Sequence, residues 1–310
     1  MTDQAEPSLQ TGPPTGVRSI LSSPYAALVI AMFCWGGIIV LVRYVRDDFP
    51  PLGLSFWRIF IAFFILLPFS IGPLRRQWSV VRENWKIFAL LSLLFWVGGN
   101  ALLFLSLQYT VALNAGVINS AEPLLIVLFA WLLFRDPFTR KQGFGLVLSL
   151  LGVVVLISRG SLDRLLQLDF NKGDLFVAAA YTFWSLYAVL LRKIPRGLDQ
   201  RVILTVLLGF GSIYLFPLYL AETTYIRPVP LNLANVATAV FVAIFASLIP
   251  MLLWNFSILK LGPGRAGQFV HLISVFSVLL AITFLGEIPG THHMAGIALI
   301  VTGLIIAARR

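Results

Sequence analysis

The chain has 310 residues, of which 59% are apolar and only 12% are charged. Soluble domains carry about 25% charged residues, so this composition excludes an ordinary soluble protein and predicts a chain that lies mostly in lipid. The formal net charge of +10 would suit a nucleic-acid-binding protein, but the positions of the basic residues argue against that class.

Ten apolar runs follow one another along the chain. Each approaches the roughly 20 residues that a helix needs to cross the hydrocarbon core of a bilayer. Residues 1–19 precede these runs, are polar and rich in Pro and Gly, and are expected to form a disordered cytoplasmic N-terminus. The sequence therefore predicts an all-α integral membrane protein with ten transmembrane helices. We expect them near residues 24–44, 52–72, 85–107, 110–134, 141–158, 173–193, 202–221, 233–259, 265–286 and 292–308.

The second half of the chain repeats the first. Residues 113–157 match residues 264–308 at a constant offset of 151, and Trp35 matches Trp184 at an offset of 149. Internal repetition of this kind indicates duplication of a structural unit. The duplicated unit contains five of the predicted helices.

These matches divide the chain into three parts after its N-terminus. A five-helix repeat is expected over residues 20–158, a linker over 159–172 and a second five-helix repeat over 173–310. Within the linker, three leucines at helical spacing predict a short helix on the membrane surface. They are Leu162, Leu165 and Leu166.

The basic residues are distributed unequally between the two sides of the predicted membrane. Sixteen of the 23 lysines and arginines fall on one side and six on the other, while Arg58 lies within a helix. This bias predicts that both termini are cytoplasmic and that the charge orients the protein, which leaves nucleic acid without support as a partner. Because five helices make an odd number, the second repeat must enter from the opposite face. Loop charges agree, since residues 135–141 include three basic residues and their copy, 286–293, has none.

The third and eighth runs are interrupted at the same repeat position. Gly98-Gly99 in the third run corresponds to Ile249-Pro250 in the eighth. Matched interruptions indicate a binding cavity, because freed backbone groups need a polar surrounding. Close helix packing at the glycines is the alternative explanation. The polar and aromatic residues beside the interruptions are candidates for substrate binding: Trp96, Asn100, Trp254 and Asn255.

Glu122 lies near the middle of the fourth run, where an ionised carboxylate costs several kcal/mol unless it is partnered or faces water. Its repeat counterpart is Ile273, so the repeat itself does not require an acid. A role in transport is one explanation, and a neutral Glu that only joins helices is the other. Asn119 lies one turn earlier on the same face. Both are predicted to bind substrate.

A polar stripe also marks the ninth run, with residues at spacings of three. His271 is its central member, and either a place in the transport pathway or a hydrogen-bonded packing role would account for it. Trp35, Trp184 and the nearby Tyr181 could form aromatic walls, although lipid-facing packing explains single aromatic residues equally well. The stripe consists of Gln268, His271 and Ser274.

Several other residues are expected to be structural. Arg58 is interpreted as snorkelling to the interface or pairing with a carboxylate. Asp136 and Glu287 follow equivalent helices and are interpreted as turn or capping residues. Four glycines in the fifth and tenth predicted helices suit close contact with other helices. They are spaced seven apart in each repeat, as Gly145 and Gly152, and as Gly296 and Gly303.

Together these motifs resemble the drug/metabolite transporter superfamily, specifically its ten-helix EamA-type exporters. The matching residues include Trp35-Gly36-Gly37, Arg58, Leu67-Pro68 at the expected end of the second helix, and Leu285-Gly286-Glu287. The resemblance implies a bundle whose central cavity is lined largely by helices 1, 3, 4, 6, 8 and 9, and which exports small metabolites. The aromatic-rich helix faces are also similar to those of bacterial aromatic amino acid exporters.

We therefore expect a secondary exporter of small metabolites, most simply amino acids, in the bacterial inner membrane. Drugs, nucleobases or other metabolites are the alternative cargo. An integral-membrane enzyme would need clustered His, Asp or Glu at a membrane face, and a channel would need rings of charge; neither pattern occurs. With no phosphate-binding loop and one cysteine, Cys34, no cofactor or metal is expected. Glu122 or His271 could couple protons, uncoupled facilitation is equally compatible, and a monomer would suffice.

Overall fold

The computed structural model describes residues 23–45, 50–106, 109, 118–166, 172–230, 232–285 and 290–308. Helices and short connections make up these ranges, and no strand occurs within them. The expected N-terminal segment 1–19 and Glu287 lie outside the described residues. The helices of the first repeat are α2 (Pro24–Val45), α3 (Pro51–Glu83), α4 (Trp85–Ser92), the π-helix η1 (Leu93–Ala101), α5 (Leu102–Ser106), α7 (Glu122–Phe134) and α8 (Arg140–Ser158).

A short helix, α9 (Leu162–Leu166), occupies the linker, as its leucine spacing predicts. The second repeat contains π-helical and 3-10 segments within its longer helices. Each of the ten predicted apolar runs contains helix. The elements after α9 are α10 (Lys172–Leu190), η2 (Leu191–Lys193), α11 (Gln200–Tyr225), α12 (Leu233–Val242), η3 (Ala243–Leu248), α13 (Ile249–Leu261), α14 (Pro263–Gly267), η4 (Gln268–His271), α15 (Leu272–Leu285) and α16 (Thr291–Ala308).

The length and apolarity of these helices indicate an all-α membrane protein. Five of them are long and apolar enough to cross a bilayer, and four further apolar helices are shorter. Many large apolar side chains on the outer surface are exposed, as expected where lipid replaces water as the solvent. The five long helices cover Pro51–Glu83, Lys172–Lys193, Gln200–Tyr225, Leu233–Leu261 and Pro263–Phe284.

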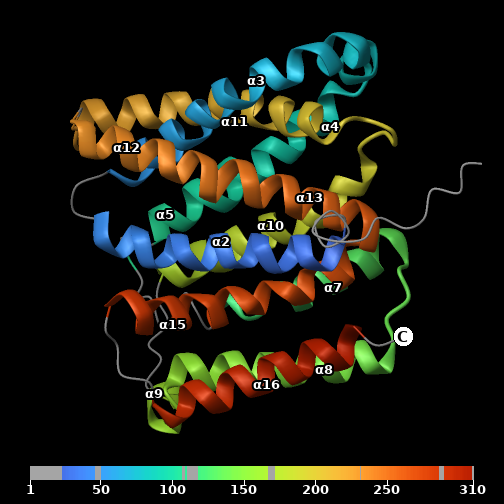
Figure 1. The fold of residues 1–310 in the computed structure, drawn as a ribbon, viewed down its shortest axis with the longest axis vertical. Helices are drawn as coiled ribbons and strands as arrows, with labels where there is room; N and C mark the ends of the chain where they lie inside the picture. Colours follow the sequence, from blue (N-terminus) through green and yellow to red (C-terminus); the bar gives the residue numbers. More distant parts are fainter. Residues whose placement is uncertain are drawn as a thin grey trace, which may run out of the picture.

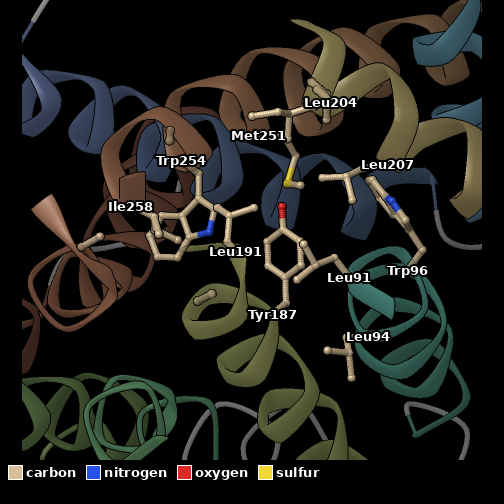
Figure 2. Close-up of a cluster of buried hydrophobic side chains, with 14 of the residues drawn as sticks. Leu91, Leu94, Trp96, Tyr187, Leu191, Leu204, Leu207, Met251, Trp254 and Ile258 are labelled. Carbon is tan, nitrogen blue, oxygen red and sulfur yellow. The ribbon is translucent and has the colours of Figure 1, made fainter. Parts of the chain in front are cut away.

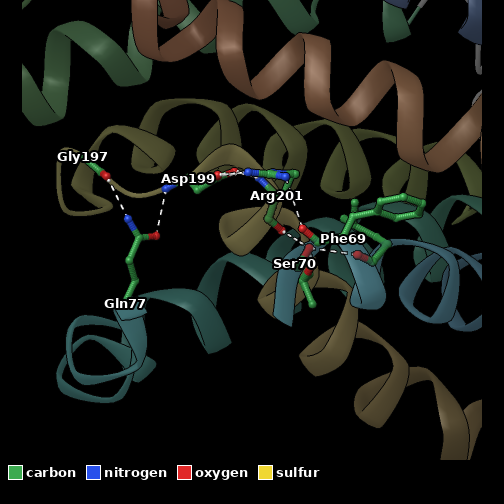
Figure 3. Close-up of polar contacts among 8 residues, drawn as sticks. Phe69, Ser70, Gln77, Gly197, Asp199 and Arg201 are labelled. Carbon is green, nitrogen blue, oxygen red and sulfur yellow. Dashed lines mark hydrogen bonds and ion pairs between the residues drawn. The ribbon is translucent and has the colours of Figure 1, made fainter. Parts of the chain in front are cut away.

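Helix α3 continues past its predicted end, through Pro68 and Pro73. Proline has no N–H, so Pro73 cannot donate to the carbonyl of Phe69. Figure 3 shows how the guanidinium of Arg201 in α11 donates to that carbonyl instead, at 3.3 Å. Asp199 holds the guanidinium with an N–O distance of 2.6 Å, and this hydrogen bond lowers the pKa of the Asp199 carboxyl. A neighbouring helix thus satisfies the backbone that proline leaves unpaired.

The helices form two groups with a pair of helices at each end (Figure 1). We define the α10 group as α10, η1, α5 and α7, which contact one another, and the α2 group as α2, η3, α13 and α15, which also pack together. Each group combines the first helix of one repeat with the third and fourth helices of the other. Helices α3 and α11 lie at one end of the molecule, and α8 and α16 lie at the other.

Equivalent helices of the two repeats pack antiparallel at both ends. In α8 and α16, Gly145 lies against the carbonyl of Gly303, and Gly152 lies against the carbonyl of Gly296. These contacts exchange equivalent positions, as two-fold symmetry requires. They leave no room for a Cβ atom, so the predicted close helix contact at these glycines is confirmed, and the structure shows that the two helices are each other's partners.

Helices α3 and α11 show the same antiparallel arrangement. The carboxylate of Glu222, near the end of α11, accepts hydrogen bonds from Leu52 N at 3.1 Å and Gly53 N at 2.6 Å, at the start of α3. Towards the other end, Thr205 Oγ1 donates to Ser70 Oγ at 2.8 Å. Glu222 therefore caps the N-terminus of α3 from a neighbouring helix, where the helix dipole favours negative charge.

Candidate functional site

A cavity of about 200 Å³ lies between the α10 group and the α2 group. A single water molecule needs roughly 10–15 Å³ of comparable space, so the cavity has room for a small molecule. Its walls come from helices 1, 3, 4, 6, 8 and 9 of the resemblance, with one addition, Arg58 of helix 2. The lining residues are Trp35, Arg58, Phe95, Trp96, Asn100, Leu103, Asn119, Glu122, Tyr181, Trp184, Tyr187, Ala246, Trp254, Val270 and Ile273.

The cavity wall follows the internal repeat. Ten of its fifteen residues form pairs that occupy equivalent positions in the two repeats. The cavity therefore lies on the axis that relates the repeats. The pairs are Trp35 with Trp184, Phe95 with Ala246, Leu103 with Trp254, Asn119 with Val270, and Glu122 with Ile273.

Two π-helical segments, η1 and η3, lie at matching positions beside the cavity. Within them, the carbonyls of Phe95 and Ala246 are equivalent and each accepts a bond from an indole. Trp184 Nε1 donates to Phe95 O at 3.2 Å, and Trp35 Nε1 donates to Ala246 O at 3.1 Å. Pro250, four residues after Ala246, has no N–H for that carbonyl. Each tryptophan thus ties the first helix of one repeat to the third helix of the other.

Gly99 shows why the interruption in the first repeat contains glycine. A Cβ atom at this position would overlap the indole of Trp184. The glycine pair therefore permits close packing of α10, while Trp96 and Asn100 beside it line the cavity. Both explanations offered for the interruption describe part of the structure.

The two walls of the cavity differ in chemistry although their backbones are equivalent. Polar side chains gather on the α10 group, and their counterparts in the other repeat are apolar. The cavity is therefore polar on one side and apolar on the other. In two contrasting pairs both members line the cavity, Asn119 with Val270 and Glu122 with Ile273. Asn100, Tyr181 and Tyr187 line it too, and their apolar counterparts, Met251, Met32 and Ile38, are not part of the cavity wall.

Arg58 contributes a buried guanidinium to the polar wall. Its side chain is 8% exposed, donates from Nη2 to Asn100 Oδ1, and lies 5.5 Å from the ring centroid of Trp96. Asn100 in turn donates to Phe95 O at 2.8 Å, which fixes the orientation of its amide. Sequence reasoning assigned Arg58 to structure. The signal that could have placed it here is a full charge inside an apolar run.

Eight of the twelve residues that the sequence singled out for substrate binding line this cavity. They come from both repeats and from five different helical runs, so the fold brings together positions far apart in the chain. Phe95 and Tyr187 also line it, and neither was a sequence candidate. The eight are Trp35, Trp96, Asn100, Asn119, Glu122, Tyr181, Trp184 and Trp254.

The other four candidates lie outside the cavity wall. His271 is buried between helices, with Nδ1 at 2.8 Å from Ser149 Oγ and Nε2 at 3.1 Å from Ser120 O, its own repeat counterpart. A carbonyl only accepts, so Nε2 carries the hydrogen. Gln268 is also buried, and Ser274 is half-buried beside it on the same helical run.

The fourth of these, Asn255, forms a contact between the two helix groups. Tyr187 Oη donates to Asn255 Oδ1 at 2.8 Å. Figure 2 shows Tyr187 beside Leu191, with its hydroxyl directed toward Met251. The bond joins α10 of one group to α13 of the other.

No group of three His, Cys, Asp or Glu side chains that could hold a metal ion occurs in the described part of the chain. Asp136 and Arg192 instead form an ion pair at 2.6 Å, outside the cavity and directly after α7. This position agrees with the turn role expected for Asp136.

Comparison with known proteins identifies the family. The model of the EamA-like transporter family matches residues 22–158 and, a second time, residues 171–309. The chain belongs to the EamA-like transporter family. The predicted membership of the drug/metabolite transporter superfamily is thereby confirmed, and this EamA-like transporter is a multi-pass membrane protein that moves small substrates.

Its relatives extend over nearly the whole chain. The uncharacterized transporter YyaM of Bacillus subtilis is 26% identical over 88% of this chain and 89% of its own. Protein RarD of Escherichia coli is 27% identical over 89% of this chain and 90% of its own. A crystal structure with 23% identity aligns with a TM-score of 0.78, covering 93% of this chain and 96% of that one, and supports the fold.

Proposed function

We propose that this EamA-like transporter exports amino acids, aromatic or otherwise neutral, across the bacterial inner membrane as a secondary transporter. The observation that carries the proposal is the cavity on the repeat axis, which is polar on one side and aromatic or aliphatic on the other. An amino acid has the same division, because its charged ammonium and carboxylate groups occupy one end and its side chain the other.

The arrangement of the helices favours transport by alternating access. Antiparallel packing of equivalent helices supports two repeats of opposite orientation. The ten apolar runs and the bias of the basic residues support ten spans with both termini in the cytoplasm. Transporters built this way open by rocking of one helix group against the other around a fixed site. The α10 and α2 groups are the moving bodies in this proposal. Breaking the Tyr187–Asn255 hydrogen bond is one step of opening.

A counterflow assay tests the function directly. The purified protein is reconstituted in liposomes loaded with one unlabelled amino acid, and uptake of each labelled amino acid is measured. We expect saturable exchange for at least one neutral amino acid, and its absence from protein-free liposomes. Exchange of nucleobases or drugs with no amino acid exchanged would contradict the proposed cargo, and non-saturable flux would indicate a channel.

Trp254→Ala provides the variant that links transport to the cavity. Because Trp254 lines the cavity and is 3% exposed, its loss should lower exchange by roughly tenfold or more while the protein still purifies in folded form. Trp78→Ala is the matched control, since Trp78 lies at the surface of α3 and is 55% exposed. Equal exchange by both variants would place the site elsewhere.

A further inference from the structure

Arg58 is the one arginine or lysine in the wall of the cavity. It forms no ion pair with any carboxylate in the described part of the chain. Its Nη2 donates to the neutral amide of Asn100, and its Nε is buried without an acceptor among the described residues. Its guanidinium lies near the face of Trp96, which attracts a cation but accepts no directed hydrogen bond.

A charge buried in this way is costly unless something neutralises it. Guanidinium groups inside membrane proteins normally pair with carboxylates or face water. Glu122 lines the same cavity, yet no ion pair joins it to Arg58. The cavity therefore contains a cationic donor whose anionic partner is not supplied by the described protein residues.

We propose that the missing partner is the carboxylate of the transported molecule, bound by Arg58. This assignment rests on the proposed function and names the feature that a substrate must carry. The planar guanidinium matches a carboxylate in geometry and can donate two parallel hydrogen bonds to it. Asn100 acts as a positioning residue, because its amide is fixed between Arg58 and the carbonyl of Phe95.

Glu122 narrows the class of anion. A phosphate or dicarboxylate would bring a second negative charge into a cavity that already contains an acidic side chain. A molecule with one carboxylate and one ammonium group adds no net charge, and its ammonium can lie toward Glu122 or an aromatic face. The structure thus favours α-amino acids over amines, neutral nucleobases and phosphorylated metabolites.

Competition with matched compounds tests this assignment. The labelled amino acid that exchanges best in liposomes is challenged with its own unlabelled form, its carboxamide and its decarboxylated amine. We expect the carboxamide and the amine to compete roughly ten- to a hundredfold more weakly, because each lacks the charged acceptor for Arg58. Equal competition by either compound would overturn the proposal while leaving amino acid transport intact.

Two variants separate recognition from structure. Arg58→Gln keeps hydrogen-bond donors but no charge, so its preference for carboxylate over carboxamide should fall to within about threefold. Arg58→Lys should retain part of the preference. If Arg58 were only structural, its substitution would change the amount of folded protein without changing the preference for carboxylate over carboxamide. An unchanged preference in Arg58→Gln would therefore refute the assignment.

If Arg58→Gln does not fold, the preference is compared between the wild-type protein and Arg58→Lys, and these two values test the assignment. Failure of every amino acid and amine to exchange would reject the proposed function as well.

Discussion

Glu122 is the acidic residue of the cavity wall, and helix packing alone does not require an acid at this position. Its repeat counterpart, Ile273, lines the same cavity, so an apolar side chain satisfies the equivalent position. The side chain is 8% exposed at the first turn of α7. A carboxyl group there is costly in its ionised form, so its gain or loss of a proton can respond to substrate and to the opening of the cavity.

Substitution of Glu122 distinguishes coupling from structure. If its proton drives accumulation, Glu122→Gln should abolish proton-dependent uptake and preserve counterflow, because glutamine keeps the shape but cannot titrate. A structural Glu122 would tolerate glutamine and fail as leucine, which leaves polar neighbours unsatisfied at a cost of about 1–3 kcal/mol. Net uptake with and without a pH gradient measures the difference.

Glu222 serves as the control for that experiment. It is a buried acid that caps α3 rather than lining the cavity. Glu222→Gln should therefore leave the gradient dependence unchanged. Gradient-dependent uptake by Glu122→Gln at the wild-type level would show that the proton does not pass through Glu122.

At the scale of the helices, the two π-helical segments explain the interruptions that the sequence revealed only as glycine and proline. Each segment presents a carbonyl to an indole from the first helix of the other repeat. The two carbonyls differ in the number of side-chain donors that bond to them. Phe95 O also accepts from Asn100 Nδ2, whereas for Ala246 O the indole of Trp35 is the side-chain donor that the structure describes.

This difference predicts unequal costs for equivalent substitutions. Trp35→Phe should destabilise the folded protein by about 1–3 kcal/mol, because it removes the side-chain donor to a buried carbonyl. Trp184→Phe should cost less, since Asn100 still donates to Phe95. Thermal unfolding of both variants in detergent measures the ordering. A larger loss for Trp184→Phe would mean that ring packing, rather than the hydrogen bond, dominates.

The helices themselves were predictable because apolar runs of membrane-spanning length leave few alternatives. The π-helical segments were not, because their geometry depends on donors contributed by helices far away in the chain. The end of α3 was missed for the same reason. Pro68 was expected to close this helix, but Arg201 of another helix satisfies the backbone at Phe69 and allows it to continue.

The site was predictable where the repeat marked it. Comparison of the two repeats identified Trp35, Trp184 and the positions around Gly99, which all lie at or beside the cavity. Polarity alone was a weaker guide, since His271 and Asn255 are polar intramembrane residues whose partners are other helices. The sequence shows that a residue is polar, but only the packing of the helices shows whether its side chain contacts another helix or lines the cavity.

For the whole molecule, the proposed opposite orientation of the repeats is open to a labelling test. Single cysteines at Arg140 and Thr291, both exposed at the start of α8 and α16, are introduced in a Cys34→Ala background. An impermeant maleimide added to intact cells should label Thr291→Cys alone, and Arg140→Cys should react only after lysis. Labelling of both from one side would refute the inverted arrangement.

The exchange of first helices between the repeats also sets an order for biosynthesis. Trp184 and its carbonyl partner are 89 residues apart, so the α10 group has all its helices once about three fifths of the chain has been made. Trp35 bonds to a residue 211 positions later, and α2 therefore remains without its final neighbours until α13 and α15 emerge. Contacts so distant in sequence form slowly. The first helix to enter the membrane is thus among the last to reach its native packing, and a nascent chain that stalls before α13 exposes it to the cell's quality control.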